Sequence, residues 1–192
     1  IKRLGWKSKI ELTMHGEPTL NPNWVYLISI IRNVLPENQI MLSTNGTGLV
    51  RKPGSGFWIQ EALHAGANII VVEKYNHSKM WIELVQGVID VGVEKFEYPK
   101  DKNASPNKRW PKRTQVVIFL EDLKKMTDGT HSRINNGCRS ASEPLSEPIM
   151  EKCVRPFREI AFRWDGKVAI CCNDWKGELI CGDITKKRLE EI

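Results

Sequence analysis

Strand-like and helix-like patterns alternate through residues 1–125, and this alternation constrains the fold more than any other feature of the chain. Short runs rich in β-branched and other apolar residues predict strands at residues 10–14, 40–44, 68–73, 93–98 and 114–120. Apolar residues at helical spacing predict helices at residues 22–35, 55–65 and 78–89. The first of these helices is expected to start at Pro22, with Asn21 as its N-cap. Because strands that alternate with helices form parallel βαβ units, the pattern predicts an α/β fold whose sheet is open or partly closed into a barrel.

A stretch rich in Ser, Asn, Gly and Pro, residues 128–148, separates this part from a tail that contains most of the cysteines. We expect a barrel domain at residues 1–127, a linker at 128–152 and a small domain at 153–192. Within the small domain, Asp165 and Gly166 form a strong turn dipeptide between two strand-like runs. The tail is therefore predicted to contain a β-hairpin.

The chain has five cysteines, Cys138, Cys153, Cys171, Cys172 and Cys181. It starts without an export signal, so we expect a cytoplasmic protein, in which clustered thiols indicate a metal rather than disulfides. Structural zinc favours C-x-x-C pairs, which are absent here, so single cysteines favour an iron–sulfur cluster. Zinc, or buried thiols that act as small hydrophobic groups, are the alternatives. Because neighbouring strand residues point to opposite faces, only one of Cys171 and Cys172 is expected to bind a given metal centre.

The charge balance and the apolar runs exclude other classes of protein. The net charge of +6 is too small to indicate nucleic-acid binding by itself, and no apolar run is long enough to cross a membrane. Residues 100–113 carry six basic side chains and Trp110, and this segment is interpreted as a solvated loop rather than a phosphate contact. We expect neither a nucleic-acid nor a membrane partner.

Polar segments follow the first two predicted strands. His15 to Pro18 follows one, and Ser43 to Gly46 follows the other. Ligands of such sheets bind at the carboxyl ends of the strands. By its position Glu17 either binds a ligand ammonium group or caps the helix that follows, while His15 is interpreted as a satisfied polar residue.

Together these features resemble the radical S-adenosylmethionine (radical SAM) proteins that carry a SPASM or twitch-type auxiliary cluster domain. The segment 12–22 resembles the G-G-E-P motif of that family, with His15 at the position of the first glycine. The segment 41–47 resembles the family's T-N-G segment. The resemblance implies that S-adenosylmethionine binds to Gly16, Glu17, Pro18, Ser43 and Asn45.

The tail resembles the opening of the SPASM pattern, in which a Cys, nine to fifteen residues, a Gly, four residues and a Cys follow one another. Cys153, twelve residues, Gly166, four residues and Cys171 fit this spacing. Further cysteines of the full pattern are missing, so the resemblance implies one auxiliary [4Fe–4S] cluster, as in the twitch variant. Its implied ligands are Cys153, Cys171 and Cys181, with Cys138, Cys172 or a residue beyond Ile192 as the fourth.

One departure from the family concerns the motif C-x-x-x-C-x-x-C, which holds the catalytic [4Fe–4S] cluster and is absent from the chain. We expect this motif upstream of Ile1, so that the chain is an excerpt of a partial (β/α)6 barrel without its first strand. The catalytic cluster is then present only with that missing N-terminus. Loss of the motif in a degenerate paralogue is the alternative.

The implied function is that of a radical SAM enzyme. Its parent protein would generate a 5′-deoxyadenosyl radical to modify a peptide or a small molecule, with a reductant such as flavodoxin or ferredoxin. The alternative is a non-catalytic iron–sulfur or zinc-binding module derived from the same family.

Overall fold

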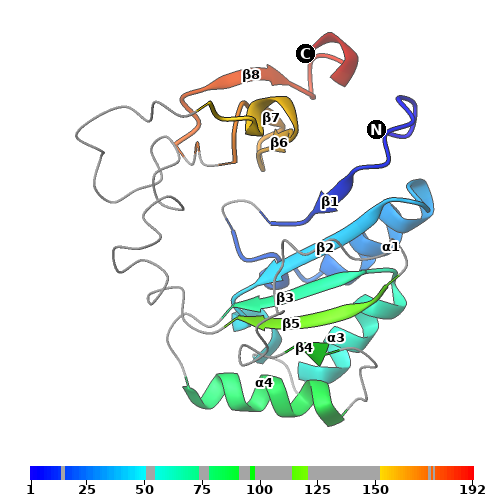
Figure 1. Cartoon of the computed structure of the whole chain (residues 1–192), viewed down its shortest axis with the longest axis vertical. Coiled ribbons are helices and arrows are strands. Elements are labelled where there is room, and N and C mark those ends of the chain that lie inside the picture. Colours follow the sequence, from blue (N-terminus) through cyan, green and yellow to red (C-terminus); the bar gives the residue numbers. More distant parts are fainter. Residues whose placement is uncertain are drawn as a thin grey trace. The chain divides into compact units, whose positions relative to one another are not determined.

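The computed structural model describes residues 1–13, 16–50, 55–73, 78–90, 96–97, 114–120, 152–172, 174 and 176–192. The chain divides into two compact units, unit 1 from Ile1 to Leu123 and unit 2 from Lys124 to Ile192 (Figure 1). Cys138, His15, Trp110 and the expected linker up to residue 151 lie outside the described residues. The expected boundaries at residues 127 and 152 stay a prediction.

Unit 1 alternates strands and helices along the chain. Its strands are β1 (Lys9–Glu11), β2 (Gln39–Thr44), β3 (Ile69–Glu73), β4 (Phe96–Glu97) and β5 (Val116–Leu120). Its helices are α1 (Trp24–Val34), α2 (Thr47–Val50), α3 (Ser55–His64) and α4 (Ser78–Asp90), with the 3-10 helix η1 (Pro18–Leu20). The predicted α/β class with a parallel sheet is confirmed, and α2 and η1 are additional to the predicted elements.

The strands of unit 1 are all parallel and follow the order β1-β2-β3-β5-β4. A sheet wound strand by strand in chain order would have β4 beside β3. Here β5 pairs with β3 along its whole length, from Ile69 opposite Val116 to Glu73 opposite Leu120. The two-residue β4 pairs only with β5 and lies at the edge. Closure into a partial (β/α)6 barrel stays a prediction.

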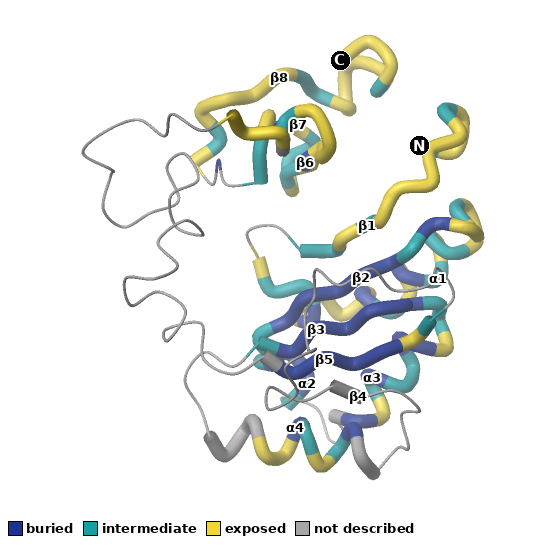
Figure 2. The backbone as a smooth tube through the Cα atoms, viewed as in Figure 1, coloured by how far each residue is buried: buried dark blue, intermediate teal, exposed yellow. Residues whose placement is uncertain are grey.

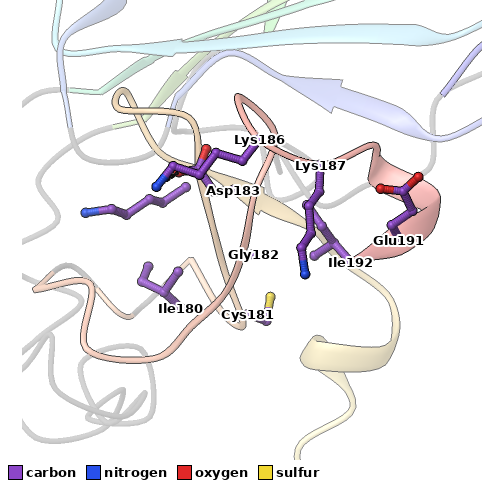
Figure 3. A pocket seen from close by; sticks show the side chains of 9 residues that line it. Ile180, Cys181, Gly182, Asp183, Lys186, Lys187, Glu191 and Ile192 are labelled. Carbon is purple, nitrogen blue, oxygen red and sulfur yellow. Dashed lines mark ion pairs between the residues drawn. The ribbon is translucent and has the colours of Figure 1, made fainter.

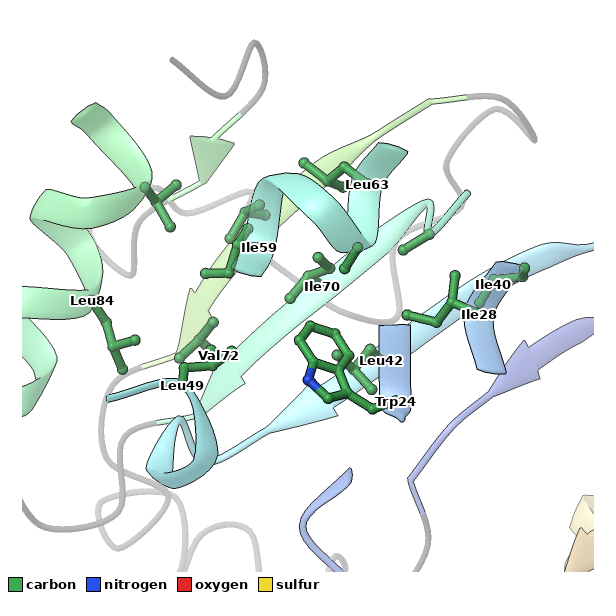
Figure 4. Close-up of a cluster of buried hydrophobic side chains, with 14 of the residues drawn as sticks. Trp24, Ile28, Ile40, Leu42, Leu49, Ile59, Leu63, Ile70, Val72 and Leu84 are labelled. Atoms are coloured by element: carbon green, nitrogen blue, oxygen red, sulfur yellow. The ribbon is translucent and has the colours of Figure 1, made fainter. Parts of the chain in front are cut away.

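The core of unit 1 lies between the sheet and its helices. Alternate residues of β2 and β3, such as Leu42 and Val72, pack against Trp24 of α1 and Ile59 of α3 (Figure 4). Side chains alternate along a strand, so the intervening residues of β2, β3 and β5 point to the other face. There they form a second buried cluster, Met41, Ile69, Val71, Val116 and Ile118. Burial on both faces explains why these strands are continuous apolar runs.

Hydrogen bonds of Arg32 tie α1 to the amino ends of β2 and β3. Its guanidinium donates to the carbonyl oxygens of Gly66, Pro36 and Asn38 at 2.7–2.8 Å and to Oδ1 of Asn68 at 2.6 Å. Oδ1 of Asn68 also accepts the backbone N–H of Ile40 at 2.9 Å. These bonds fix the amino edge of the sheet, where the chain enters β2 and β3.

The start of α1 differs from the expectation. The helix begins at Trp24 and its N-cap is Asn23, not Asn21. Oδ1 of Asn21 instead accepts the backbone N–H of Asn23 at 2.9 Å, which forms a local turn after η1. The Asn side chain stabilises the turn before the helix, so the predicted cap was two residues early.

Unit 2 contains a three-stranded antiparallel sheet with the order β6-β7-β8, formed by β6 (Ala161–Phe162), β7 (Lys167–Ala169) and β8 (Ile180–Asp183). The 3-10 helices η2 (Arg155–Phe157) and η3 (Leu189–Glu191) flank it. Gly166 has a φ of 82° in the turn between β6 and β7, and a Cβ there would overlap Thr185, so this turn requires glycine. Of the described residues in either unit, none belongs to a helix long and apolar enough to cross a lipid bilayer.

Candidate functional site

The side chain of Glu17 connects the two polar segments that follow β1 and β2. Its Oε2 accepts the backbone N–H of Asn45 at 2.7 Å, and its Oε1 accepts the hydroxyl of Thr44 at 2.6 Å. Oε1 also accepts the backbone N–H of Thr19 at 2.9 Å and the Thr19 hydroxyl at 2.5 Å. Two segments that lie 28 residues apart in the sequence therefore meet at the carboxyl ends of the strands.

The neighbouring backbone is held by polar side chains as well. Oγ1 of Thr13 donates to the carbonyl of Ser43 at 2.7 Å and accepts the backbone N–H of Ser43 at 3.0 Å, which extends the pairing of β1 with β2. Oδ1 of Asn45 accepts the backbone N–H of Thr47 and so starts α2. Within α2, a Cβ on Gly48 would overlap Thr19, so α2 and η1 are in direct contact.

The polar groups of the predicted ligand residues differ in how many hydrogen bonds they make within the protein. The carboxylate of Glu17 caps η1, one of the two roles expected for it, and Oε1 is fully engaged while Oε2 accepts one hydrogen bond. Within the described part of the chain, the Ser43 hydroxyl and the Asn45 amide nitrogen have no hydrogen-bond partner. Beside Gly16, a Cβ would meet no described atom within 4 Å. Small and polar groups thus remain available to a ligand at this edge.

Thr19 and Thr44 were not singled out from the sequence as site residues. They hold the Glu17 carboxylate from opposite segments, and their own hydroxyls lie 3.3 Å apart. Both are buried. The available signal was their position. Thr44 ends a predicted strand and lies next to Asn45, and Thr19 lies two residues after Glu17, where a hydroxyl can satisfy a carboxylate.

None of the described cysteines of unit 2 is in a disulfide. Cys153 and Cys181 are exposed, and Cys171 and Cys172 are half-buried. The thiol of Cys172 donates to Oε2 of Glu159 at 3.9 Å, an interaction that only a protonated thiol makes. The strand β7 ends at Ala169, so Cys171 and Cys172 lie beyond it, and the face alternation expected from a longer strand does not apply to them.

Cys181 lies on β8 at an irregularity of the sheet. Ala169 pairs with Ile180 and Val168 pairs with Gly182, so Cys181 is the extra residue of a β-bulge. Its Sγ lies 3.3 Å from the carbonyl oxygen of Val168. Cys181 also lines a hollow of about 360 Å³ within unit 2 (Figure 3), together with Lys167, Ile180, Gly182, Asp183, Lys186, Lys187, Glu191 and Ile192.

Among the described residues, no three His, Cys, Asp or Glu side chains are close enough to hold one metal ion. The structure thus does not gather Cys153, Cys171 and Cys181 into one centre, and Cys138 is not described. The chemistry of the donors nevertheless fits an iron–sulfur cluster, since free thiols, three of them outside the strands, are its usual ligands. The ligand set therefore stays a prediction.

The loop between β7 and β8 contains a buried carboxylate, Asp174, that sequence reasoning missed. Asp174 is fully buried, and its two oxygens accept the backbone N–H groups of Glu178 and Leu179. Asp and Asn side chains commonly bond the nearby backbone in turns. The pair Asn173-Asp174 between two predicted strand runs was therefore the available signal.

Known proteins resemble the chain in two ways, one match covering the tail alone and the other nearly the whole chain. Residues 153–192 match the SPASM family, an iron–sulfur cluster-binding domain. A crystal structure of BtrN in complex with AdoMet and 2-DOIA superimposes with a TM-score of 0.62 at 18% identity, over 99% of this chain and 63% of that chain. Selenomethionine BtrN in an open conformation gives a TM-score of 0.58 at 15% identity, over 99% and 60%. The chain therefore spans less than two thirds of the BtrN chains. No curated protein sequence is a significant match.

At these identities the likeness to BtrN establishes the fold alone. The chain thus shares the fold of BtrN, and its tail, residues 153–192, matches the SPASM iron–sulfur cluster-binding domain.

Proposed function

We propose that this chain binds S-adenosylmethionine at the carboxyl edge of its parallel sheet and an auxiliary [4Fe–4S] cluster in unit 2. It does so as part of an enzyme that modifies a peptide or a small molecule. The observation that carries the proposal is the contact between Glu17 and Asn45 at 2.7 Å, because it joins the two segments that resemble the family's ligand-binding motifs. The structure of BtrN with AdoMet supports the same ligand for this fold.

Each residue of the proposed S-adenosylmethionine site has a physical role. Gly16 leaves room for close approach of a ligand to the backbone, and Pro18 starts η1 behind it. The remaining lone-pair direction on Oε2 of Glu17 would accept a hydrogen bond from the ligand ammonium. The free Ser43 hydroxyl and Asn45 amide would bind polar groups of the ligand. Glu17 thus both shapes the site and contacts the ligand.

Cys153, Cys171 and Cys181 are the proposed cluster ligands, with Cys138 or a residue beyond Ile192 as the fourth. Cys172 is the least suited, because its thiol faces the carboxylate of Glu159. When bound, the auxiliary cluster would bind substrate or carry an electron, and a protein such as flavodoxin or ferredoxin would reduce the enzyme. The radical chemistry of the family also requires the C-x-x-x-C-x-x-C motif, which these 192 residues do not contain.

Metal analysis of the anaerobically purified chain tests the proposal. We expect about four irons and four sulfides per chain and a broad absorption band near ~400 nm. Cys153→Ser and Cys171→Ser should each lower the iron content by at least half, whereas Cys172→Ser should leave it unchanged. Equal iron in all three variants, or no iron in the folded wild type, would overturn the cluster assignment.

A second candidate is a non-catalytic iron–sulfur or zinc module of the same family, a role that does not require the C-x-x-x-C-x-x-C motif. It predicts that S-adenosylmethionine does not bind. Isothermal titration of S-adenosylmethionine into the chain separates the two candidates. Ser43→Ala is expected to weaken binding, and Ser29→Ala, at a half-buried position of α1, is its control. One zinc per chain without sulfide, and no heat of binding, would favour the module.

A further inference from the structure

Asp174 is the only charged side chain of the described residues that is fully buried. A buried carboxylate is costly unless hydrogen bonds satisfy it. Oδ1 accepts the N–H of Glu178 at 3.1 Å, and Oδ2 accepts the N–H of Leu179 at 2.7 Å. The side chain therefore fixes the backbone of the segment that leads into β8.

The backbone of Asp174 is bonded in both directions along the chain. Its N–H donates to the carbonyl of Cys171 at 3.1 Å, which closes a tight turn after that cysteine. Its carbonyl accepts the N–H of Gly177 at 3.1 Å and Nη1 of Arg163 at 3.2 Å. One residue thus connects the Cys171 turn, the β6–β7 turn and the entry to β8.

The entry to β8 determines where Cys181 lies. The N–H of Ile170 donates to the carbonyl of Leu179 at 3.0 Å, next to the N–H that Asp174 holds. Two residues later Cys181 is the extra residue of the bulge. A shift of Leu179 would slip this pairing, and a slip of one residue turns every following side chain to the other face. The orientation of Cys181 therefore depends on the Asp174 carboxylate.

We propose that Asp174 is a positioning residue of the iron–sulfur site, which fixes the spacing between Cys171 and Cys181. This inference rests on the proposed function, in which both cysteines are cluster ligands. The near-isosteric Asp174→Asn keeps one oxygen to accept one N–H but turns an NH2 group toward the other. It also removes a negative charge beside a ligand, and the net charge near a cluster helps to set its reduction potential.

The test uses the whole chain, reconstituted anaerobically as wild type, Asp174→Asn and Asp174→Ala. Asp165→Asn is the matched control, a half-buried aspartate in the β6–β7 turn whose side chain also accepts a backbone N–H. Iron and sulfide per chain, the EPR spectrum of the reduced protein and the midpoint potential are measured. We expect at least a twofold loss of iron in Asp174→Asn, a greater loss in Asp174→Ala and no change in Asp165→Asn. The cluster that remains in Asp174→Asn should have an altered EPR spectrum and a more positive potential.

Two other outcomes would contradict the role of Asp174, and a third would contradict the proposed function. Wild-type iron, spectrum and potential in Asp174→Asn would overturn the role of Asp174 while the cluster assignment stands. Reduced iron with an unchanged spectrum and potential in the remaining cluster would also overturn it, because Asp174 would then affect only the yield of folded protein. A folded wild type without iron would overturn the proposed function, and the role of Asp174 with it.

Discussion

At the scale of single residues, Glu17 is the most constrained group of unit 1 near the proposed ligand site. Its carboxylate accepts hydrogen bonds from Thr19, Thr44 and Asn45, and only a carboxylate can accept all of them. Glu17→Gln would place an NH2 group against one of these donors. An exposed counterpart is Glu11, which forms an ion pair with Lys9 at 3.7 Å.

We expect Glu17→Gln to lower the free energy of unfolding by about 2 kcal/mol, since a buried donor left unpaired costs roughly 1–3 kcal/mol. Affinity for S-adenosylmethionine should fall at least tenfold. Urea unfolding and isothermal titration measure the two effects, and Glu11→Gln should change neither. Full stability in Glu17→Gln would show that the four contacts are not maintained in solution.

A second prediction at this scale concerns the acid titration of Asp183 in unit 2. Hydrogen bonds from the hydroxyl of Thr185, at 2.6 Å, and from its backbone N–H, at 2.9 Å, lower the pKa of Asp183 below the usual value of 3.8. A carboxyl whose pKa is lowered by folding stabilises the fold above its unfolded pKa. This contribution is lost as the pH falls through the lowered folded pKa.

Thr185→Val removes the hydroxyl donor and should move the pKa of Asp183 upward, toward 3.8. A carboxyl ¹³C NMR titration between about pH 2 and 6 measures the shift. Asp165 serves as an internal reference: burial raises its pKa, but hydrogen bonds and the charge of Lys167 lower it below the usual value. Its titration should be unchanged. An unmoved Asp183 would mean that Thr185 does not control this carboxyl.

At the scale of elements, α3 and α4 approach each other through two glycines. A Cβ on Gly56 would overlap the backbone carbonyl of Gly87, and Gly56 is buried. In an isolated helix the change from Gly to Ala stabilises by about 1 kcal/mol. The helix contact reverses this sign, because a backbone carbonyl cannot rotate away as a side chain can.

We therefore expect Gly56→Ala to destabilise unit 1 by about 2 kcal/mol, within the range for overpacking a buried site. The midpoint of urea unfolding checks this value. Ser29→Ala, at a half-buried position of α1 whose hydroxyl bonds only within the helix, should stay within about 0.5 kcal/mol of wild type. A stabilised Gly56→Ala would show that α3 and α4 are further apart than the structure has them.

The elements also show what the sequence could predict. Apolar periodicity located the strands and long helices of unit 1, because burial against one sheet imposes it. Periodicity could not predict that β5 lies beside β3, since strand order depends on contacts between distant segments. The turn at Asn21 and the early end of β7 at Ala169 depend on local hydrogen bonds, which compete with the regular elements. The sequence suggested Glu17 and Asn45 as site residues, which stays a prediction. It could not predict the bonds of Glu17 to the hydroxyls of Thr19 and Thr44, because hydroxyl partners follow no spacing rule.

At the scale of the whole molecule, the two units differ in what holds them together. Unit 1 buries two apolar clusters around its sheet. In the described part of unit 2, the buried hydrophobic residues are only Ala161, Val168 and Ala169, while the side chains of Phe157 and Trp164 are 89% and 92% exposed. Figure 2 shows the same contrast, with most of the described residues of unit 2 exposed. Domains as short as the matched segment 153–192 usually require disulfides or a metal when few side chains are buried, and none of its cysteines is in a disulfide.

Removal of iron should therefore affect the units unequally. When binding of a metal centre supplies the free energy of folding, its removal unfolds the domain that holds it. We expect a strong iron chelator, added under anaerobic reduction, to raise amide hydrogen exchange in residues 161–183 at least tenfold, while exchange in β2, β3 and β5 stays unchanged. Exchange followed by peptide mass spectrometry resolves the two regions in one sample. Because the amides of the Asp174 loop bond across unit 2, they should lose protection together with β7 and β8. Retained protection throughout unit 2 after complete loss of iron would show that its few buried side chains suffice, and that the cysteines do not hold this unit together.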